Sequence, residues 1–180
     1  MMKKVLVIIG NGENGNTDQL SQSFVDGARF AGHEVRKIVL HHDIQGCKGC
    51  RACQHNGHQC VIKDDMQVIY PLFEESDVLV LASPLYFWSI SGRLKSFIDR
   101  LYAISTNDEY PSKETILLMT SGCEEFYAFE QPVSYYRLLT NALGWNDRGM
   151  VLAYGCKGDP AHKWIDKKYL EKAFQLGKIL

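Results

Sequence analysis

The chain has 180 residues, the length of one domain, and 46% of them are hydrophobic, so a buried core is expected and disorder is not. Its 20 basic and 21 acidic side chains nearly cancel, which gives no electrostatic reason to expect nucleic acid or a membrane surface as a partner. Every apolar run is shorter than the roughly 20 residues of a membrane-spanning helix. We expect one domain over residues 1–180 in the cytoplasm, where cysteines stay reduced.

Strand-like and helix-like patterns alternate along the chain. Short apolar runs predict strands that are buried on both faces, and apolar residues at helical spacing predict amphipathic helices between them. The expected strands cover residues 4–9, 34–40, 77–83, 115–119 and 149–154. The expected helices cover residues 17–31, 64–76, 91–104, 126–143 and 162–180.

This alternation implies an α/β fold in which a parallel sheet has helices on both faces. In such open sheets, ligands bind beyond the carboxyl ends of the strands. A site is therefore expected in the loops that follow Ile9, Leu40, Ala82, Met119 and Tyr154.

The loop after the first strand is rich in glycine and reads Gly10-Asn11-Gly12-Glu13-Asn14-Gly15-Asn16-Thr17. Glycines let backbone N–H groups curl around an anion, and the N-terminus of the following helix favours negative charge. Asn16 and Thr17 add side-chain donors. The loop therefore predicts a phosphate site, with a plain turn and helix cap as the structural alternative.

Two kinds of phosphate ligand are considered for this loop. Gly10, Gly12 and Gly15 match the dinucleotide fingerprint, which lies between a strand and a helix. That fingerprint also requires an acidic residue at the end of the second strand, where His41 and His42 stand, and a six-stranded sheet. A P-loop is excluded because the chain has no Gly-Lys-Ser/Thr at this place. The phosphate of FMN is the better match.

The loops after the third and fourth strands suit a flavin ring, which is flat and apolar with polar edges. The first of them carries Pro84, Leu85, Tyr86, Phe87 and Trp88, which offer apolar and aromatic faces. The second begins Thr120-Ser121-Gly122, whose small residues let the backbone approach a ring. The aromatic residues could instead pack on the core or on a partner subunit, and Ser-Gly is also an ordinary turn pair.

Four segments of the chain together resemble the flavodoxin-like NAD(P)H-dependent FMN reductases and iron–sulfur flavoproteins. They are the loop that ends in Gly15-Asn16-Thr17, residues 47–66, the run from Ser83-Pro84-Leu85-Tyr86-Phe87-Trp88 into Leu94-Lys95-Ser96-Phe97-Ile98-Asp99-Arg100, and Thr120-Ser121-Gly122. The resemblance implies a three-layer sandwich with a five-stranded parallel sheet of order 2-1-3-4-5. In one departure, relatives often carry Ser and Arg in the phosphate loop, where this chain has Asn11 and the acidic Glu13.

Four of the six cysteines are close in sequence, with the spacing Cys47-x2-Cys50-x2-Cys53-x6-Cys60. This spacing resembles the [4Fe–4S] site of the iron–sulfur flavoproteins. Zinc could take the same thiolates, and the cysteines could also be metal-free loop residues or redox thiols. The sequence leaves these three interpretations open, and the neighbouring histidines are given no role.

The resemblance implies an FMN-dependent oxidoreductase that passes electrons from NAD(P)H through the flavin to a quinone, another small molecule or a protein. Because the flavin supplies the chemistry, no side chain is assigned as a general acid or base. The alternatives are an electron carrier without substrate turnover and a metal-binding module without flavin. The expected FMN contacts are Asn11, Asn14, Gly15, Asn16, Thr17, Pro84, Leu85, Tyr86, Phe87, Trp88, Thr120, Ser121 and Gly122.

A homodimer or homotetramer is also expected. The aromatic residues 86–88 and the pair Tyr135-Tyr136 offer more apolar surface than one small domain needs outside its core. The resemblance adds that the flavin lies near a subunit interface.

Overall fold

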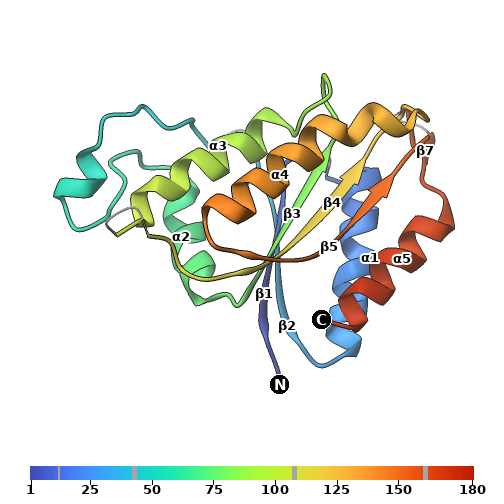
Figure 1. The fold of residues 1–180 in the computed structure, drawn as a ribbon, viewed down its shortest axis with the longest axis horizontal. Coiled ribbons are helices and arrows are strands. Elements are labelled where there is room, and N and C mark those ends of the chain that lie inside the picture. The colour runs from blue at the N-terminus through green and yellow to red at the C-terminus, as the bar shows by residue number, and fades with distance from the viewer. Residues whose placement is uncertain (12, 42–43, 107–108, 160–161) are drawn as a thin grey trace.

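A computed structural model describes residues 1–11, 13–41, 44–106, 109–159 and 162–180, so Gly12 and His42 lie outside the described residues. Five parallel strands form one sheet of order β2-β1-β3-β4-β5, with helices on both faces (Figure 1). The expected fold class and strand order are confirmed. The strands are β1 (Lys4–Ile9), β2 (Glu34–Val39), β3 (Val78–Pro84), β4 (Glu114–Thr120) and β5 (Asn146–Ala153).

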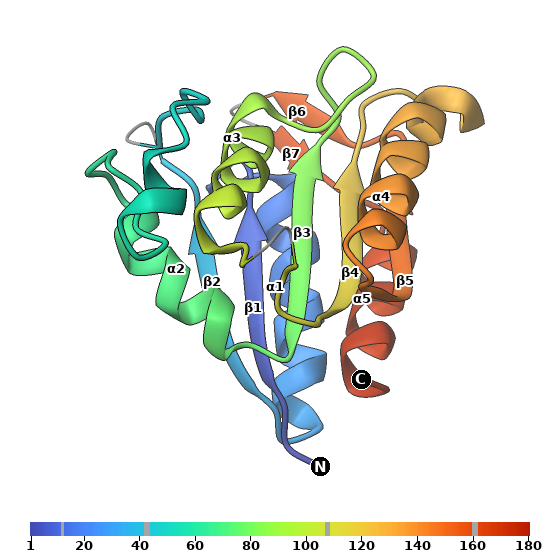
Figure 2. The same cartoon turned by 60° about the vertical axis from the view of Figure 1, so that its left-hand side comes forward.

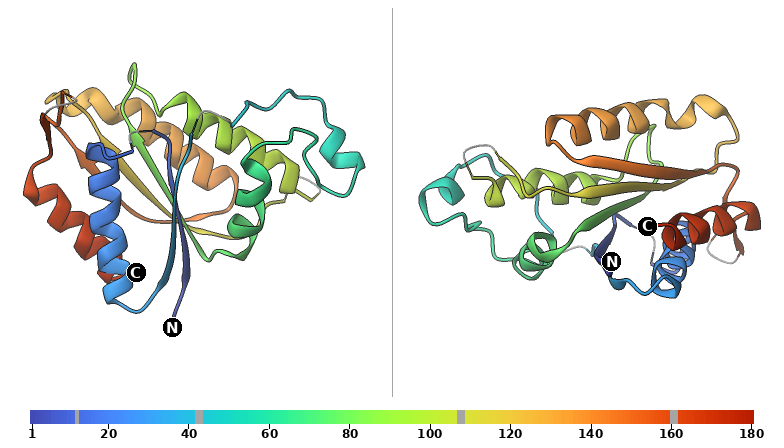
Figure 3. Two further views of the ribbon diagram at one scale, coloured as in Figure 1. Left: turned by 180° about the vertical axis from the view of Figure 1, so that it is seen from behind. Right: turned by 60° about the horizontal axis from the view of Figure 1, so that its bottom comes forward.

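The helices cover the sheet in two groups, each over its own hydrophobic core (Figure 3). One group packs on the face with Val5, Val7 and Ile9, and the other on the face with Leu6 and Ile8. The first group is α1 (Asn16–Phe30) and α5 (Lys167–Lys178), and the second is α2 (Met66–Glu75), α3 (Gly92–Arg100) and α4 (Glu130–Ala142). Across the described ranges, no helix combines the length and the apolar character needed to cross a bilayer.

Two expected helices are only partly α-helical. The segment expected over 91–104 ends in the 3₁₀ turn η2 (Leu101–Ile104), and the one over 126–143 begins with the 3₁₀ turn η3 (Phe126–Phe129). The helix α4 starts at Glu130, before Pro132, because a proline in the first turn lacks only an N–H that has no partner within the helix.

The expected helix over residues 162–180 is wrong at its start. Residues His162–Trp164 form the strand β7, which pairs antiparallel with β6 (Lys157–Asp159). The helix α5 begins only after Asp166, whose carboxylate accepts a 3.0 Å hydrogen bond from the Lys168 amide and so caps it. Trp164 is half-exposed on the hairpin.

The expectation that Tyr135 and Tyr136 form an exposed apolar pair is also wrong. Tyr136 is buried, and its hydroxyl donates to Asp147 Oδ1 at 2.9 Å and pairs with the Thr115 hydroxyl at 3.0 Å. Tyr135 is partly buried and packs against the same core. The ring of Tyr136 can therefore lie in the core, because its hydroxyl has hydrogen-bond partners there.

Candidate functional site

A cavity of about 340 Å³ lies at the carboxyl ends of β1, β3 and β4, within the size range of small-molecule sites. Figure 2 shows that the loop between β3 and α3 and the β6–β7 hairpin lie at this same end of the sheet. The lining residues are Glu13, Gly15, Asn16, Thr17, Pro84, Leu85, Tyr86, Thr120, Ser121, Gly122, Cys156, Gly158 and Lys163. The structure therefore brings together residues from the three loops in which FMN contacts were expected, those after β1, β3 and β4.

One end of the cavity is the start of α1. Its N-cap residue is Gly15, which has no side chain to accept hydrogen bonds from the first-turn N–H groups. A 2.6 Å hydrogen bond joins the hydroxyls of Thr17 and Thr120, so the loop after β1 is tied to the end of β4. This end of the cavity suits an anion, because first-turn amides and the helix dipole both favour negative charge.

The loop from β1 also packs tightly against α3. A Cβ atom at Gly10 would lie 2.3 Å from Ser91 Oγ and 2.7 Å from Leu94 Cβ, so only glycine fits. The Asn11 amide accepts from Arg93 at 2.6 Å and donates to the Tyr86 hydroxyl at 2.8 Å. Asn11 thus joins the two loops and does not line the cavity.

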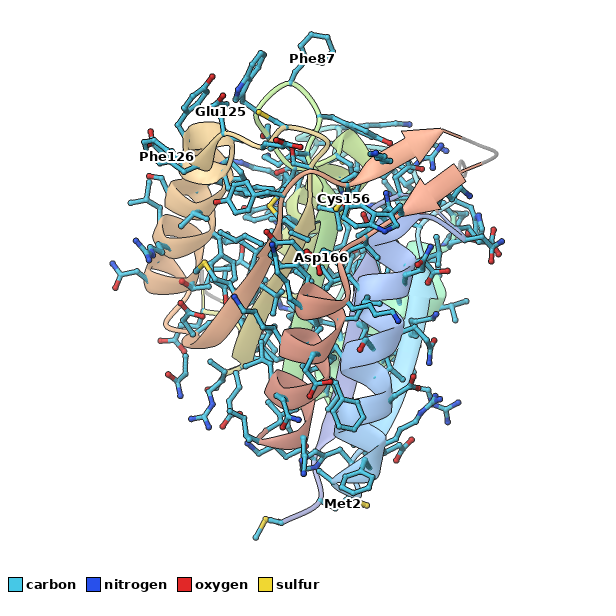
Figure 4. All side chains as sticks on the ribbon, turned by 90° about the vertical axis from the view of Figure 1, so that its right-hand side faces the viewer. Met2, Phe87, Glu125, Phe126, Cys156 and Asp166 are labelled. Carbon is cyan, nitrogen blue, oxygen red and sulfur yellow. The ribbon has the colours of Figure 1, made fainter. Side chains whose placement is uncertain are left out.

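The loop between β3 and α3 ends in a tight hairpin turn. Tyr86 and Ser89 exchange two backbone hydrogen bonds of 3.0 Å. The two residues between them, Phe87 and Trp88, have positive φ angles of 45° and 58°, which bulky side chains rarely adopt. Phe87 is 95% exposed and points away from the fold (Figure 4). Phe87 and Trp88 therefore lie outside the cavity, whereas Pro84 and Leu85 line it.

Several lining residues follow β5, where a ligand-binding loop was expected but no contact residue was predicted. Cys156 lies beneath the loop that follows β4, and its amide donates to the Ser121 carbonyl at 2.8 Å (Figure 4). Burial raises the pKa of the Cys156 thiol, which therefore stays neutral at pH 7. Lys163 Nζ donates to the Asn14 carbonyl at 2.8 Å, so Asn14 contacts the hairpin and does not line the cavity. In the sequence, the one sign of these residues was that they follow Tyr154, at the end of an expected strand.

The family model for NADPH-dependent FMN reductases matches residues 3–127. The chain belongs to this family. An iron–sulfur flavoprotein from Archaeoglobus fulgidus is 29% identical over 98% of this chain and 77% of its own length. An FMN-dependent NADH:quinone oxidoreductase from Alteromonas mediterranea is 24% identical over 86% of this chain and 88% of its own.

Solved structures share the fold of this FMN reductase family member. An NAD(P)H:quinone oxidoreductase from Methanothermobacter marburgensis superposes with a TM-score of 0.72 at 16% identity, over 99% of this chain and 96% of that one. An azoreductase from Bacillus anthracis gives a TM-score of 0.70 at 19% identity, over 99% and 100% of the two chains.

The residues around the cavity fit FMN, the cofactor that gives the family its name. The start of α1 offers amides for a terminal phosphate, and Pro84 and Leu85 offer an apolar wall for a ring. Asn16 Oδ1 is buried without a hydrogen-bond partner among the described residues. A hydroxyl of a ribityl chain would supply the donor that this oxygen lacks.

The cysteine loop forms a separate feature beside α3. Cys47, Cys50, Cys53 and Cys60 line one small cavity of about 20 Å³, together with Arg100. All four are free thiols, and no group of three or more potential ligands in the described part of the chain is placed to hold a metal ion. Four thiols around one cavity match the donor set of a [4Fe–4S] cluster, although they would have to move closer together to share one.

Arg100 holds both ends of the cysteine loop. Its buried guanidinium donates to the Gln45 carbonyl at 2.9 Å before the loop, and to both carboxylate oxygens of Asp64 at 2.7 and 3.0 Å after it. Burial alone raises the pKa of Asp64, but the hydrogen bonds from Arg100 and from the Gln45 and Met66 amides outweigh it and lower that pKa overall. Asp64 therefore stays ionised and keeps the loop closed.

Replacement of Arg100 should destabilise the fold strongly. Arg100→Met would leave the Asp64 carboxylate buried without its partner, and we expect unfolding free energy to fall by about 3–5 kcal/mol. Urea unfolding followed by circular dichroism measures the change. Because the folded pKa of Asp64 lies below its unfolded value of about 4, the pair stabilises the fold above that pH and less as pH falls through the folded pKa.

A matched control is Arg36→Met, which removes an exposed pair with Glu34 and should cost less than about 1 kcal/mol. The double variant Arg100→Met/Asp64→Leu should recover much of the stability, because it leaves no unpaired buried charge. Equal stability of Arg100→Met and Arg36→Met would contradict this account.

Proposed function

We propose that this protein is an FMN-dependent oxidoreductase that passes electrons from NAD(P)H through the flavin to a quinone, another small molecule or a protein. The observation that carries the proposal is the cavity at the carboxyl ends of β1, β3 and β4. It joins an anion-binding helix start to an apolar wall, as a flavin mononucleotide requires. The family match and the names of the relatives support the same activity.

The chain's own residues serve to bind and orient the cofactor. FMN supplies the redox chemistry when it is bound. The first-turn amides of α1, including those of Asn16 and Thr17, would hold the phosphate, and Pro84 and Leu85 would contact the ring. The neutral Cys156 thiol is not suited to act as a base.

We also propose that Cys47, Cys50, Cys53 and Cys60 hold a [4Fe–4S] cluster. Their four thiols surround one cavity, and the Archaeoglobus fulgidus relative is named an iron–sulfur flavoprotein. The Arg100 clamp supports the proposal because it fixes where the loop begins and ends.

A cytoplasmic location fits these residues, since all six cysteines are free thiols and a reducing compartment keeps them so.

Self-association into a homodimer or homotetramer completes the proposal. Two exposed aromatic groups stand at the cavity end of the molecule, as Figure 4 shows for Phe87 and Phe126. The remaining members of these groups are Tyr86, Trp88 and Tyr127. Apolar surface of this kind is typical of an interface rather than of a free monomer.

The first test is flavin reduction. Anaerobic stopped-flow mixing of holoprotein with NADH or NADPH should bleach the flavin absorbance, and a quinone should restore it, with turnover in the usual range of about 1–10³ s⁻¹. Thr17→Asp would add a carboxylate at the start of α1 and should weaken FMN binding more than tenfold, about 1.4 kcal/mol. If the flavin stays oxidised for minutes with either nucleotide, the proposed enzyme activity is wrong and the protein is an electron carrier without substrate turnover.

The second test concerns metal content. Protein purified without air should contain iron and sulfide that are lost in air, and Cys50→Ser should remove them. Cys123→Ser changes a cysteine outside the loop and should leave the iron content unchanged. Less than about half an iron per chain, with freely titrating thiols, would contradict the cluster, and stoichiometric zinc would indicate a structural site instead.

The third test is the mass in solution. Light scattering at micromolar concentration should give a dimer or tetramer, and Phe87→Asp should shift it toward the monomer because a charge would be buried at the interface. Val68→Asp places the same charge at an exposed apolar residue of α2 and should leave the mass unchanged. A monomer mass for the unaltered protein would refute self-association.

A further inference from the structure

The β6–β7 hairpin is attached to the phosphate end of the cavity by two hydrogen bonds. Asn16 Nδ2 donates to the Lys157 carbonyl at 2.7 Å, and Lys163 Nζ donates to the Asn14 carbonyl at 2.8 Å. Gly158 and Lys163 line the cavity. Figure 2 shows the hairpin above the start of α1, at the end where the strands finish. The hairpin is thus a wall of the cavity, although nearly 150 residues separate it from the phosphate loop.

A phosphate bound at this end of the cavity would need a positively charged side chain beside it. Of the described residues that line the cavity, Glu13 and Lys163 carry charge. The nearby Asp18 carboxylate already accepts from Lys37 Nζ at 2.9 Å and from the Asn14 amide at 3.0 Å. The start of a helix supplies only about half a positive charge, while a phosphate monoester carries nearly two negative ones at pH 7. Glu13 adds repulsion to this imbalance.

We propose that Lys163 binds the terminal phosphate of FMN, so that the β6–β7 hairpin is a cationic clamp on the phosphate loop. This inference rests on the proposed function. The Lys163 ammonium has three N–H donors, of which one is used by Asn14, so two remain for phosphate oxygens. Its positive charge offsets the negative charge of Glu13, which lines the same cavity. Lys163 therefore selects FMN over riboflavin, which has the same ring and ribityl chain but no phosphate.

The test compares the two flavins on the same protein. Apoprotein is titrated with FMN and with riboflavin at low salt, and binding is followed by flavin fluorescence. Lys163→Met should weaken FMN binding about tenfold and change riboflavin binding less than twofold. The control Lys157→Met removes the same charge from the same hairpin, but Lys157 contacts the loop through its carbonyl. It should change the affinity for either flavin less than twofold.

A second variant reverses the sign of the effect. Glu13→Gln removes the carboxylate from the phosphate end, so FMN should bind several-fold more tightly while riboflavin binds as before. Equal affinity of Lys163→Met and the unaltered protein for FMN would overturn the clamp. So would an equal loss for both flavins, since that would show a purely structural role. If the unaltered protein binds neither flavin, the proposed function fails, and the inference fails with it.

Discussion

The site depends on one constraint: the backbone hydrogen bonds of the parallel sheet continue one residue past the strands. The amides of Gly10, Leu85 and Ser121 donate at 2.8 Å to carbonyls of the neighbouring strands, those of Ala82, Thr120 and Ala153 respectively. Each bond fixes the first residue of a loop that lines or supports the cavity. Because the strands are parallel, these loops all begin at the same edge. The cavity is therefore positioned by the most buried part of the molecule, although its own walls are loops.

Sequence patterns predict those features that local composition determines. β1 and β3 are apolar over almost their whole length because both of their faces are covered, and this makes them visible without a structure. The glycines of the phosphate loop can also be recognised from the sequence. At Gly10 the close packing against α3 leaves no room for a side chain. Fold class and strand order follow from such elements together with the resemblance.

Features that depend on contacts between distant residues cannot be predicted from local sequence patterns. The hairpin strands β6 and β7 have three residues each, too few to show a period, and they are defined by pairing with each other. The contact of Lys163 with Asn14 is fixed by the tertiary fold alone. Phe87 differs, because a local turn sets its orientation, although its aromatic ring suggested a flavin contact. Its positive φ angle, imposed by the two bonds between Tyr86 and Ser89, turns it outward.

The helix α3 connects the two features that the proposed function uses. Its first residues lie against Gly10 and the phosphate loop, and its last residue, Arg100, holds the cysteine loop. The helix has nine residues, so these ends are separated by about 13 Å along its axis. Leu94 and Phe97 fix its apolar face in the core, which prevents it from sliding along the sheet. One packed helix therefore sets the spacing between the flavin cavity and the four cysteines, and a change in its packing would alter both.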